Sequence, residues 1–193
     1  MVGTCPAYEL LSSSSSSKRW SYVVFLSFKG EDTRKNFTGH LHMALKDVAT
    51  NVFIDDDELR RGEDISAKLV RAIEMSRISV IVFSRSYATS SWCLEELVKI
   101  MECKRTLRQM VFPIFYDVDP SDVRKQTSSF GEAFVKHADR FLFDMDRMLT
   151  VSEYNLPTRL EAKFIKEIID EITRHLNVTY LFEAVYPDQM MFA

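Results

Sequence analysis

Four short apolar runs alternate along this chain with stretches whose apolar residues recur at helical spacing. The runs occupy residues 22–28, 51–54, 78–83 and 110–116. Such runs are typical of strands that are buried on both faces of a sheet. Because short connections between strands and helices give parallel strands with right-handed crossovers, the helices should cover both faces. The sequence therefore predicts an open α/β fold of the flavodoxin-like type.

Four strands are clear from the pattern, and a fifth is left open. Apolar stripes predict helices around residues 37–48, 65–73, 94–101, 130–137 and 165–176. Residues 149–154 could form the fifth strand, although their alternation is poor. Pro113 cannot donate a ladder hydrogen bond, so the fourth strand should lie near a sheet edge or contain a local break. Residues 117–121 carry a turn signal.

Composition restricts the kinds of function that the chain can perform. With 193 residues, one domain is the default expectation. A net charge of -3 argues against nucleic-acid binding as the main task, because such domains usually carry a basic excess. The three cysteines and four histidines have no metal-ligand spacing, so we expect no metal site. No apolar run approaches the ~20 residues of a membrane span, and the odd cysteine count suits a reducing compartment. We therefore expect no membrane partner and a cytoplasmic location, with the nucleus as an alternative.

A serine homopolymer, Ser12 to Ser17, stands near the start of the chain. Serine runs bury too little apolar surface to offset the conformational entropy of ordering the chain. We therefore predict a disordered leader over residues 1–19. An organelle transit peptide is a weaker reading of the same segment, because arginine is nearly absent there and Glu9 is present.

The segment Ser90-Ser91-Trp92-Cys93-Leu94-Glu95-Glu96-Leu97 places an indole and two carboxylates at the start of a helix, directly after the third strand. In open α/β sheets, ligands bind beyond the carboxyl ends of the strands, which is where this segment should lie. Two other unusual segments, residues 28–32 and 55–62, should meet it there. On pattern alone, the commoner role of two glutamates in a first helical turn is to complement the helix dipole.

Five motifs follow one another along the chain in a fixed order. They are Phe25-Leu26-Ser27-Phe28-Lys29-Gly30-Glu31-Asp32-Thr33-Arg34, Leu59-Arg60-Arg61-Gly62, the Ser90-to-Leu97 segment, residues 115–124, and Phe130-Gly131-Glu132-Ala133-Phe134. Together they resemble a plant TIR domain, the domain that opens many intracellular plant immune receptors. The resemblance covers roughly residues 20–140 and resumes near Glu161. It implies a TIR domain at residues 20–176 and a C-terminal linker at residues 177–193. Lys29 stands where the family usually has arginine, and the family's Leu-Ser-Gly-Trp motif is missing from residues 140–160.

The resemblance implies an enzyme that cleaves NAD between nicotinamide and ribose, with NAD as substrate and no permanently bound cofactor. This cleavage resembles glycoside hydrolysis with a leaving group that is already cationic, so a carboxylate near the ribose matters more than a general acid. Glu96 matches the family's catalytic glutamate. Glu95 matches a variable position and reads as a solvated acid at the helix start.

Five other residues are candidates for contacts with NAD. Trp92 could stack on a ring or pack in the core, and Ser90 could bind ribose or cap the helix. Gly30 would let the backbone approach the ligand, and Lys29 could face the phosphates or be a solvated loop charge. By resemblance, Arg60 contacts the ligand or a neighbouring subunit, and its plainer role is a surface ion pair.

A different class of function stays open, that of an assembly module that recruits other TIR domains and has feeble catalysis. By resemblance, Gly39 and His40 in the first helix and Gly131 in the fourth helix map onto self-association surfaces. The plainer roles of His40 and Gly131 are a solvated histidine and a helix-packing glycine. A phosphoacceptor receiver domain is excluded, because Ser84 and Arg85 stand where its aspartate should end the third strand.

Overall fold

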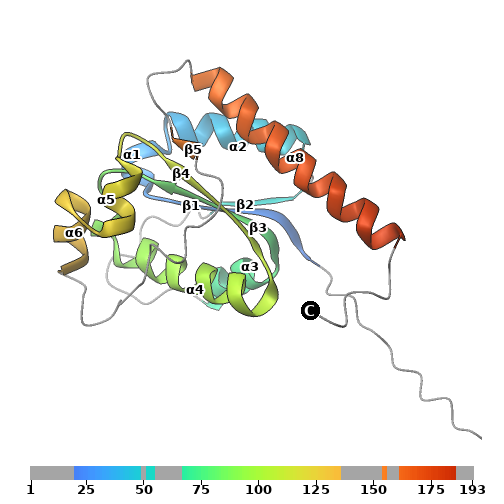
Figure 1. The fold of residues 1–193 in the computed structure, drawn as a ribbon, viewed down its shortest axis with the longest axis horizontal. Coiled ribbons are helices and arrows are strands. Elements are labelled where there is room, and N and C mark those ends of the chain that lie inside the picture. The colour runs from blue at the N-terminus through green and yellow to red at the C-terminus, as the bar shows by residue number, and fades with distance from the viewer. Residues whose placement is uncertain (1–19, 49–50, 55–66, 136–153, 156–160, 186–193) are drawn as a thin grey trace, which may run out of the picture.

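A single parallel sheet organises the computed structural model, which describes residues 20–48, 51–54, 67–135, 154–155 and 161–185. Its strands are β1 Tyr22–Phe28, β2 Val52–Ile54, β3 Ser76–Phe83, β4 Met110–Phe115 and β5 Tyr154–Asn155. They lie in the order β2-β1-β3-β4-β5 (Figure 1). This is the strand order of flavodoxin-like sheets, so the predicted fold class is confirmed.

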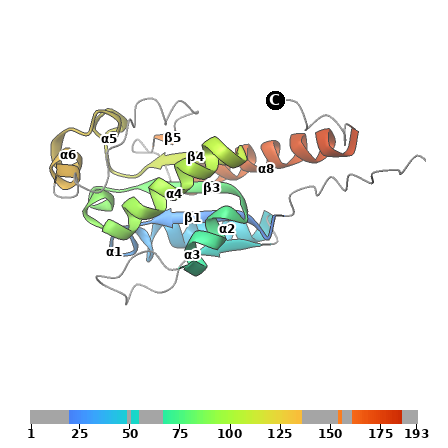
Figure 2. The same cartoon turned by 90° about the horizontal axis from the view of Figure 1, so that it is seen from below.

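Helices cover both faces of the sheet. One face carries α2 and α8, and the other carries α3 and α4 (Figures 1 and 2). The helical elements are α1 Gly30–Thr33, α2 Phe37–Val48, α3 Ala67–Glu74, η1 Tyr87–Thr89, α4 Ser91–Leu107, α5 Pro120–Lys125, α6 Ser128–Val135 and α8 Glu161–Val185. The short elements α1, α5 and α6 gather at one end of the sheet, where the strands finish (Figure 1).

Each face of the sheet has its own apolar core, and β1 contributes to both by alternation. Phe25 packs in the core beside α3 and α4, whereas Val24 and Leu26 pack in the core beside α2 and α8. Ser27 follows Phe25 by two residues and therefore faces α3 and α4 as well. β3, which pairs with β1 and β4, is buried along its whole length.

The edge of the sheet near β5 explains how β4 accommodates a proline. Pro113 lies opposite Ile81 of β3. On its other side, β5 pairs with β4 only at Ile114 and Phe115, directly after the proline. The prediction that β4 lies near an edge is confirmed. Of residues 149–154, which the sequence left open as a fifth strand, Tyr154 belongs to β5, and residues 149–153 lie outside the described residues.

A short helix, α5, stands where the sequence predicted only a turn. Asp119 is its N-cap, and its side chain accepts a hydrogen bond from the backbone N–H of Ser121 at 2.7 Å. Pro120 occupies the first helical position, where its missing N–H does no harm. The same residues that signal a turn also form a good helix start, and here the chain continues into a helix.

The last helix is longer than predicted. The sequence placed a linker from residue 177, but α8 continues to Val185, because no glycine or proline interrupts it before Pro187. The apolar stripe predicted over residues 37–48 ends at Val48, which closes α2 and is 46% exposed. Predictions about residues 1–19 and Arg60, and about the ends of the predicted helices at residues 65–66 and 136–137, lie outside the described residues.

Candidate functional site

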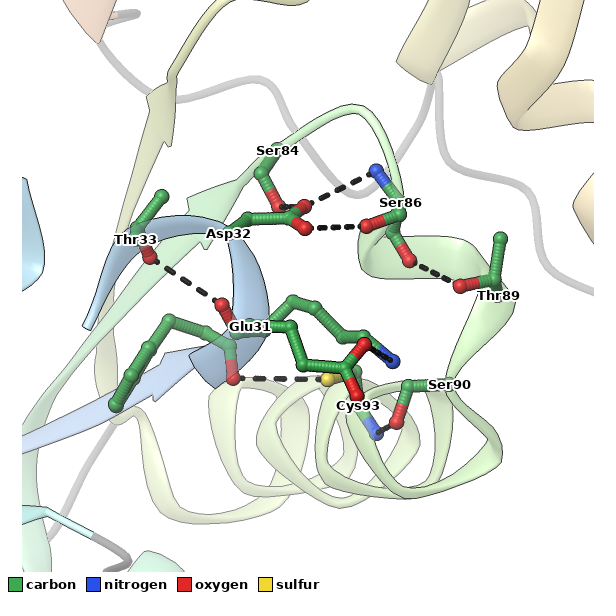
Figure 3. A network of polar contacts seen from close by, with 10 residues as sticks. Glu31, Asp32, Thr33, Ser84, Ser86, Thr89, Ser90 and Cys93 are labelled. Atoms are coloured by element: carbon green, nitrogen blue, oxygen red, sulfur yellow. Dashed lines mark hydrogen bonds and ion pairs between the residues drawn. The ribbon is translucent and has the colours of Figure 1, made fainter. Parts of the chain in front are cut away.

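The start of α4 is tied to the end of β1. Ser90 is the N-cap of α4, and its Oγ accepts a hydrogen bond from the backbone N–H of Cys93 at 3.4 Å. The thiol of Cys93 donates to the carbonyl oxygen of Phe28, the last residue of β1, at 3.6 Å (Figure 3). Because β1 and its neighbours are parallel, this contact lies beyond the carboxyl ends of the strands. That is where open α/β proteins bind ligands.

Glu96 is the only buried carboxylate among the side chains whose burial the structure describes, and it is 6% exposed. The Oγ of Ser27 donates a hydrogen bond to its Oε2 at 2.6 Å. The plainer reading of the pattern, in which Glu95 and Glu96 complement the dipole from the first helical turn, does not hold. Since α4 begins at Ser91, its first turn contains no acidic residue, and both glutamates stand in the second turn. Glu95 is half-buried rather than solvated.

Two neutral groups, the phenol of Tyr87 and the thiol of Cys93, lie beside Glu96. The Tyr87 hydroxyl lies 2.9 Å from Ser27 Oγ and donates to the carbonyl oxygen of Cys93 at 2.9 Å. Burial raises the pKa of Tyr87 well above its ordinary value, and the nearby Cys93 and Glu96 raise it further. Burial and the Glu96 carboxylate likewise raise the pKa of Cys93, so this thiol is not an activated nucleophile.

Asp32 joins the two loops that border the site, and sequence reasoning missed this role. Its Oδ2 accepts hydrogen bonds from Ser84 Oγ at 2.5 Å and from the backbone N–H of Ser86 at 3.2 Å. Its Oδ1 accepts from Ser86 Oγ at 2.5 Å, so one carboxylate receives three hydrogen bonds (Figure 3). A signal was available: an aspartate follows β1, two serines follow β3, and these two strands are neighbours.

The other predicted NAD contacts surround the same helix start. Lys29 precedes α1, and its ammonium lies 3.5 Å from the Glu31 carboxylate, with 20% of the Lys29 side chain exposed. Gly30 is half-buried and begins α1, and Trp92 is half-buried in the first turn of α4. The Lys29 charge is one of the lesser causes that act on the pKa of Cys93, which places it near α4. Arg60 lies outside the described residues.

The predicted self-association residues fall at two separate places. His40, on α2, contacts Glu161 of α8 through Nδ1 and Oε1 at 2.7 Å, and 64% of its side chain is exposed. A Cβ at Gly39 would stand 2.6 Å from the carbonyl oxygen of Arg34, and one at Gly131 would stand 2.1 Å from the carbonyl oxygen of Gln126. Both positions therefore need glycine for backbone packing, whatever else they do. A larger side chain at Gly131, such as arginine, would therefore disturb the backbone of the domain.

Within the described residues, no group of three or more histidine, cysteine, aspartate or glutamate side chains could hold a metal ion. In that same part of the chain, none of the helices has both the length and the apolar character needed to cross a membrane.

Comparison with known proteins gives consistent matches. The family model described as "TIR domain" matches residues 21–185. The TMV resistance protein N of Nicotiana glutinosa is 48% identical over 177 residues, which cover 86% of this chain and 16% of the relative. The disease resistance protein RPV1 of Vitis rotundifolia is 52% identical over 164 residues, 81% of this chain and 12% of the relative. The chain thus spans less than a fifth of the length of these relatives.

Two solved structures extend the comparison. One is the activated Roq1 resistosome, which is described as directly recognizing the pathogen effector XopQ. Its TIR domains superpose on this chain with a TM-score of 0.70 at 45% identity. That match covers 79% of this chain and 99% of the Roq1 chain. The heterodimer of the RPS4 and RRS1 TIR domains matches with a TM-score of 0.50 at 18% identity and supports the fold alone.

Proposed function

The chain belongs to the TIR domain family, as found in plant disease resistance proteins, and on that premise we propose that it cleaves NAD between nicotinamide and ribose. The products would be nicotinamide and either ADP-ribose or a cyclised form of it. Glu96 would be the catalytic carboxylate, and the activity would serve immune signalling. The proposal includes a cytoplasmic location, in keeping with the thiol of Cys93, which is in no disulfide.

The proposed reaction depends on a carboxylate near the ribose, and it does not depend on a general acid that protonates the leaving group. Cleavage breaks the bond between the ribose carbon and the nicotinamide nitrogen, and the electron pair of that bond leaves with the nitrogen. The ring is cationic before cleavage and neutral afterwards, so no proton has to reach the leaving group. Positive charge develops on the ribose instead, and a nearby carboxylate stabilises it. Glu96 is the candidate for that group.

The burial of Glu96 is the observation that carries this proposal. Taking a carboxylate out of water costs several kcal/mol, and well-packed apolar residues in place of a buried charged pair are often neutral or stabilising. A carboxylate that is 6% exposed, beyond the end of β1, is therefore better explained by chemistry than by stability. Such burial also means that a ribose can touch Glu96 only after a local rearrangement. We propose that association with a second copy supplies it.

The residues around the α4 start would bind the rest of the substrate. Lys29 would exchange its pairing with Glu31 for the phosphates of NAD, and Trp92 would stack on a ring. Gly30 and Ser90 would line the same approach. Lys29→Glu should raise the Michaelis constant for NAD, whereas Lys29→Arg should leave it equal or lower, because arginine keeps the charge and adds bidentate geometry.

The decisive experiment compares two adjacent isosteric variants. Glu96→Gln should reduce nicotinamide release from NAD by at least ~10²-fold, the scale of losing one positioned catalytic group. Glu95→Gln, one residue away, should keep nearly the full rate. Circular dichroism and thermal unfolding of both proteins verify that they are folded. Equal, undiminished rates in the two variants would remove Glu96 from the chemistry.

A second candidate function is assembly without significant catalysis. The related Roq1 TIR domains are described within an activated resistosome, which favours a domain that works through contacts with other TIR domains. The surface of α2 and α8 around His40 is open for such contacts. The two functions separate in one experiment in plant leaves: Glu96→Gln should abolish cell-death signalling if NAD cleavage is required and preserve it if assembly is sufficient.

A further inference from the structure

Three polar contacts form a continuous chain in the interior of the domain. Glu96 Oε2 lies 2.6 Å from Ser27 Oγ, Ser27 Oγ lies 2.9 Å from the Tyr87 hydroxyl, and that hydroxyl lies 2.9 Å from the carbonyl oxygen of Cys93. Ser27 and Tyr87 are both fully buried. The chain therefore runs from a carboxyl group to a backbone carbonyl through two hydroxyl groups that are shielded from water.

The number of protons does not match the number of contacts when Glu96 is ionised. Each hydroxyl carries one proton, so Ser27 and Tyr87 supply two protons for three contacts. If Ser27 donates to Glu96 and Tyr87 donates to Cys93, no proton lies between the two hydroxyl oxygens. When Glu96 is protonated, all three contacts are satisfied in one direction: Glu96 donates to Ser27, Ser27 to Tyr87, and Tyr87 to the carbonyl.

Several ionisable groups lie around this chain of contacts, and each has an environment of its own. The Cys93 thiol keeps its proton because burial raises its pKa. β4, which packs against α4, contains no ionisable side chain. The nearby charged side chains have partners of their own: Asp32 with Ser84 and Ser86, Lys29 with Glu31, and Glu74 with Lys99.

We propose that Ser27 is a positioning residue for Glu96 and that Ser27 and Tyr87 together set the pH at which Glu96 ionises, which rests on the proposed role of Glu96 in NAD cleavage. On ionisation, the carboxyl proton leaves to solvent, and the Ser27 proton turns from Tyr87 to Glu96. Tyr87 favours the protonated carboxyl because it offers Ser27 an alternative acceptor. Ser27 favours the ionised carboxyl because it donates a hydrogen bond to it.

This arrangement gives two variants opposite effects, which a purely structural role would not produce. Ser27→Ala removes the donor to the ionised carboxyl, so Glu96 should ionise at higher pH. Tyr87→Phe removes the competing acceptor, so Glu96 should ionise at lower pH. Each shift should be about one pH unit, the scale of one hydrogen bond to a charged group. Ser27→Thr retains the hydroxyl, so Glu96 should ionise at the same pH as in the wild type.

The test is a direct titration of Glu96 in the full chain. Protein labelled with ¹³C at the glutamate carboxyl is titrated by NMR, and the Glu96 signal is assigned by its absence in Glu96→Gln. Opposite shifts of the Glu96 titration midpoint in Ser27→Ala and Tyr87→Phe would support the proposal. Midpoints that stay at the wild-type value, or that move in the same direction, would overturn it. If Ser27→Ala does not fold, the direction of the Tyr87→Phe shift decides alone.

Kinetics separates this proposal from the function on which it rests. If Glu96→Gln loses nicotinamide release, the acid limb of kcat against pH in the two variants should follow the NMR midpoints, with a smaller change in KM. If Glu96→Gln keeps full activity, the proposed function fails, while the NMR result still judges the hydroxyl chain.

Discussion

The strands of this domain present different chemistry to the two faces of the sheet. Towards α2 and α8, the strands contribute apolar side chains such as Leu26, Val80 and Ile114 to the core. Towards α3 and α4, the core also contains Ser27, Tyr87 and Glu96. A core gains nothing in stability from a buried carboxylate, since apolar packing would serve at least as well. On the proposed function, one face mainly stabilises the domain, while the other also holds the polar groups of the proposed reaction.

A matched pair of substitutions in β4 tests whether the two faces of the sheet have different roles. Phe112 faces α8 and contacts His175, whereas Phe115 faces the other core and stacks on Phe83 at 5.6 Å. Each is buried, so Phe112→Ala and Phe115→Ala should both lower the free energy of unfolding by about 3–5 kcal/mol. Urea titration measures this loss.

Activity should distinguish the two variants although stability does not. Phe83 contacts Tyr87 at 5.0 Å, so loss of Phe115 reaches the hydroxyl chain within two contacts. Nicotinamide release per folded molecule should fall in Phe115→Ala and stay near wild type in Phe112→Ala. Equal losses in both would mean that the division of labour between the faces does not exist.

The next largest expected effect on stability is that of replacing Gly131 with alanine. Alanine in place of a helical glycine usually stabilises a helix by up to about 1 kcal/mol. Here a Cβ would stand 2.1 Å from the carbonyl oxygen of Gln126, so Gly131→Ala should instead destabilise the domain by about 1–3 kcal/mol. Gly131→Arg should be worse. Thermal unfolding of the alanine variant decides, and a Tm at or above wild type would show that this backbone contact relaxes easily.

Alkaline pH should destabilise the domain through Cys93 and Tyr87, which lie on the face towards α3 and α4. The pKa of Cys93 is raised above its ordinary value of 9.0, and that of Tyr87 above 10.0, mainly by burial. Above those ordinary values the unfolded chain has lost protons that the folded chain keeps, so stability falls as pH rises from about 9. Below that pH the contribution is fully present.

The slope of this loss can be assigned to each group. Each can contribute up to about 1.4 kcal/mol per pH unit. Urea unfolding between pH 7 and 10.5 should give a shallower decline in Cys93→Ala and in Tyr87→Phe than in wild type. Three parallel curves would exclude these groups as the cause.

The sequence predicted the layers of this fold better than the details of its site. Strands rich in apolar residues and five ordered motifs were sufficient to predict the sheet and the position of the Ser90-to-Leu97 segment at the start of a helix. The burial of Glu96 was less visible, because two adjacent glutamates near a helix start suggest a dipole effect. Its spacing from Cys93 and Ile100, three and four residues away, did place it on the apolar stripe.

Contacts between segments far apart in the chain could not be predicted. Asp32 accepts hydrogen bonds from serines more than 50 residues away, and Ser27 meets Glu96 across 69 residues. Only the register of neighbouring strands brings these groups together. The steric demand at Gly131 is local, but it depends on the path of the backbone after α5, which no periodicity reveals.

The smallest expected effect on stability comes from a substitution on the exposed surface of α2, one of the two helices that cover the apolar face of the sheet. Met43, one turn after His40 on α2, is 68% exposed, and an exposed methionine there contributes little to folding. Met43→Glu should therefore change the free energy of unfolding by less than about 0.5 kcal/mol. If α2 and α8 form a self-association surface, the new charge should weaken assembly, because it would have to be buried or would repel its counterpart. Sedimentation over a range of protein concentrations, with nicotinamide release measured on the same samples, tests both consequences.

Arg105→Gln on α4 is the control, since that side chain is exposed and the substitution shifts the net charge by the same amount. Wild type and control should gain specific activity as concentration rises, and Met43→Glu should not. A variant that assembles like wild type would mean that this face only stabilises the domain, and the surface for partners would have to be sought elsewhere.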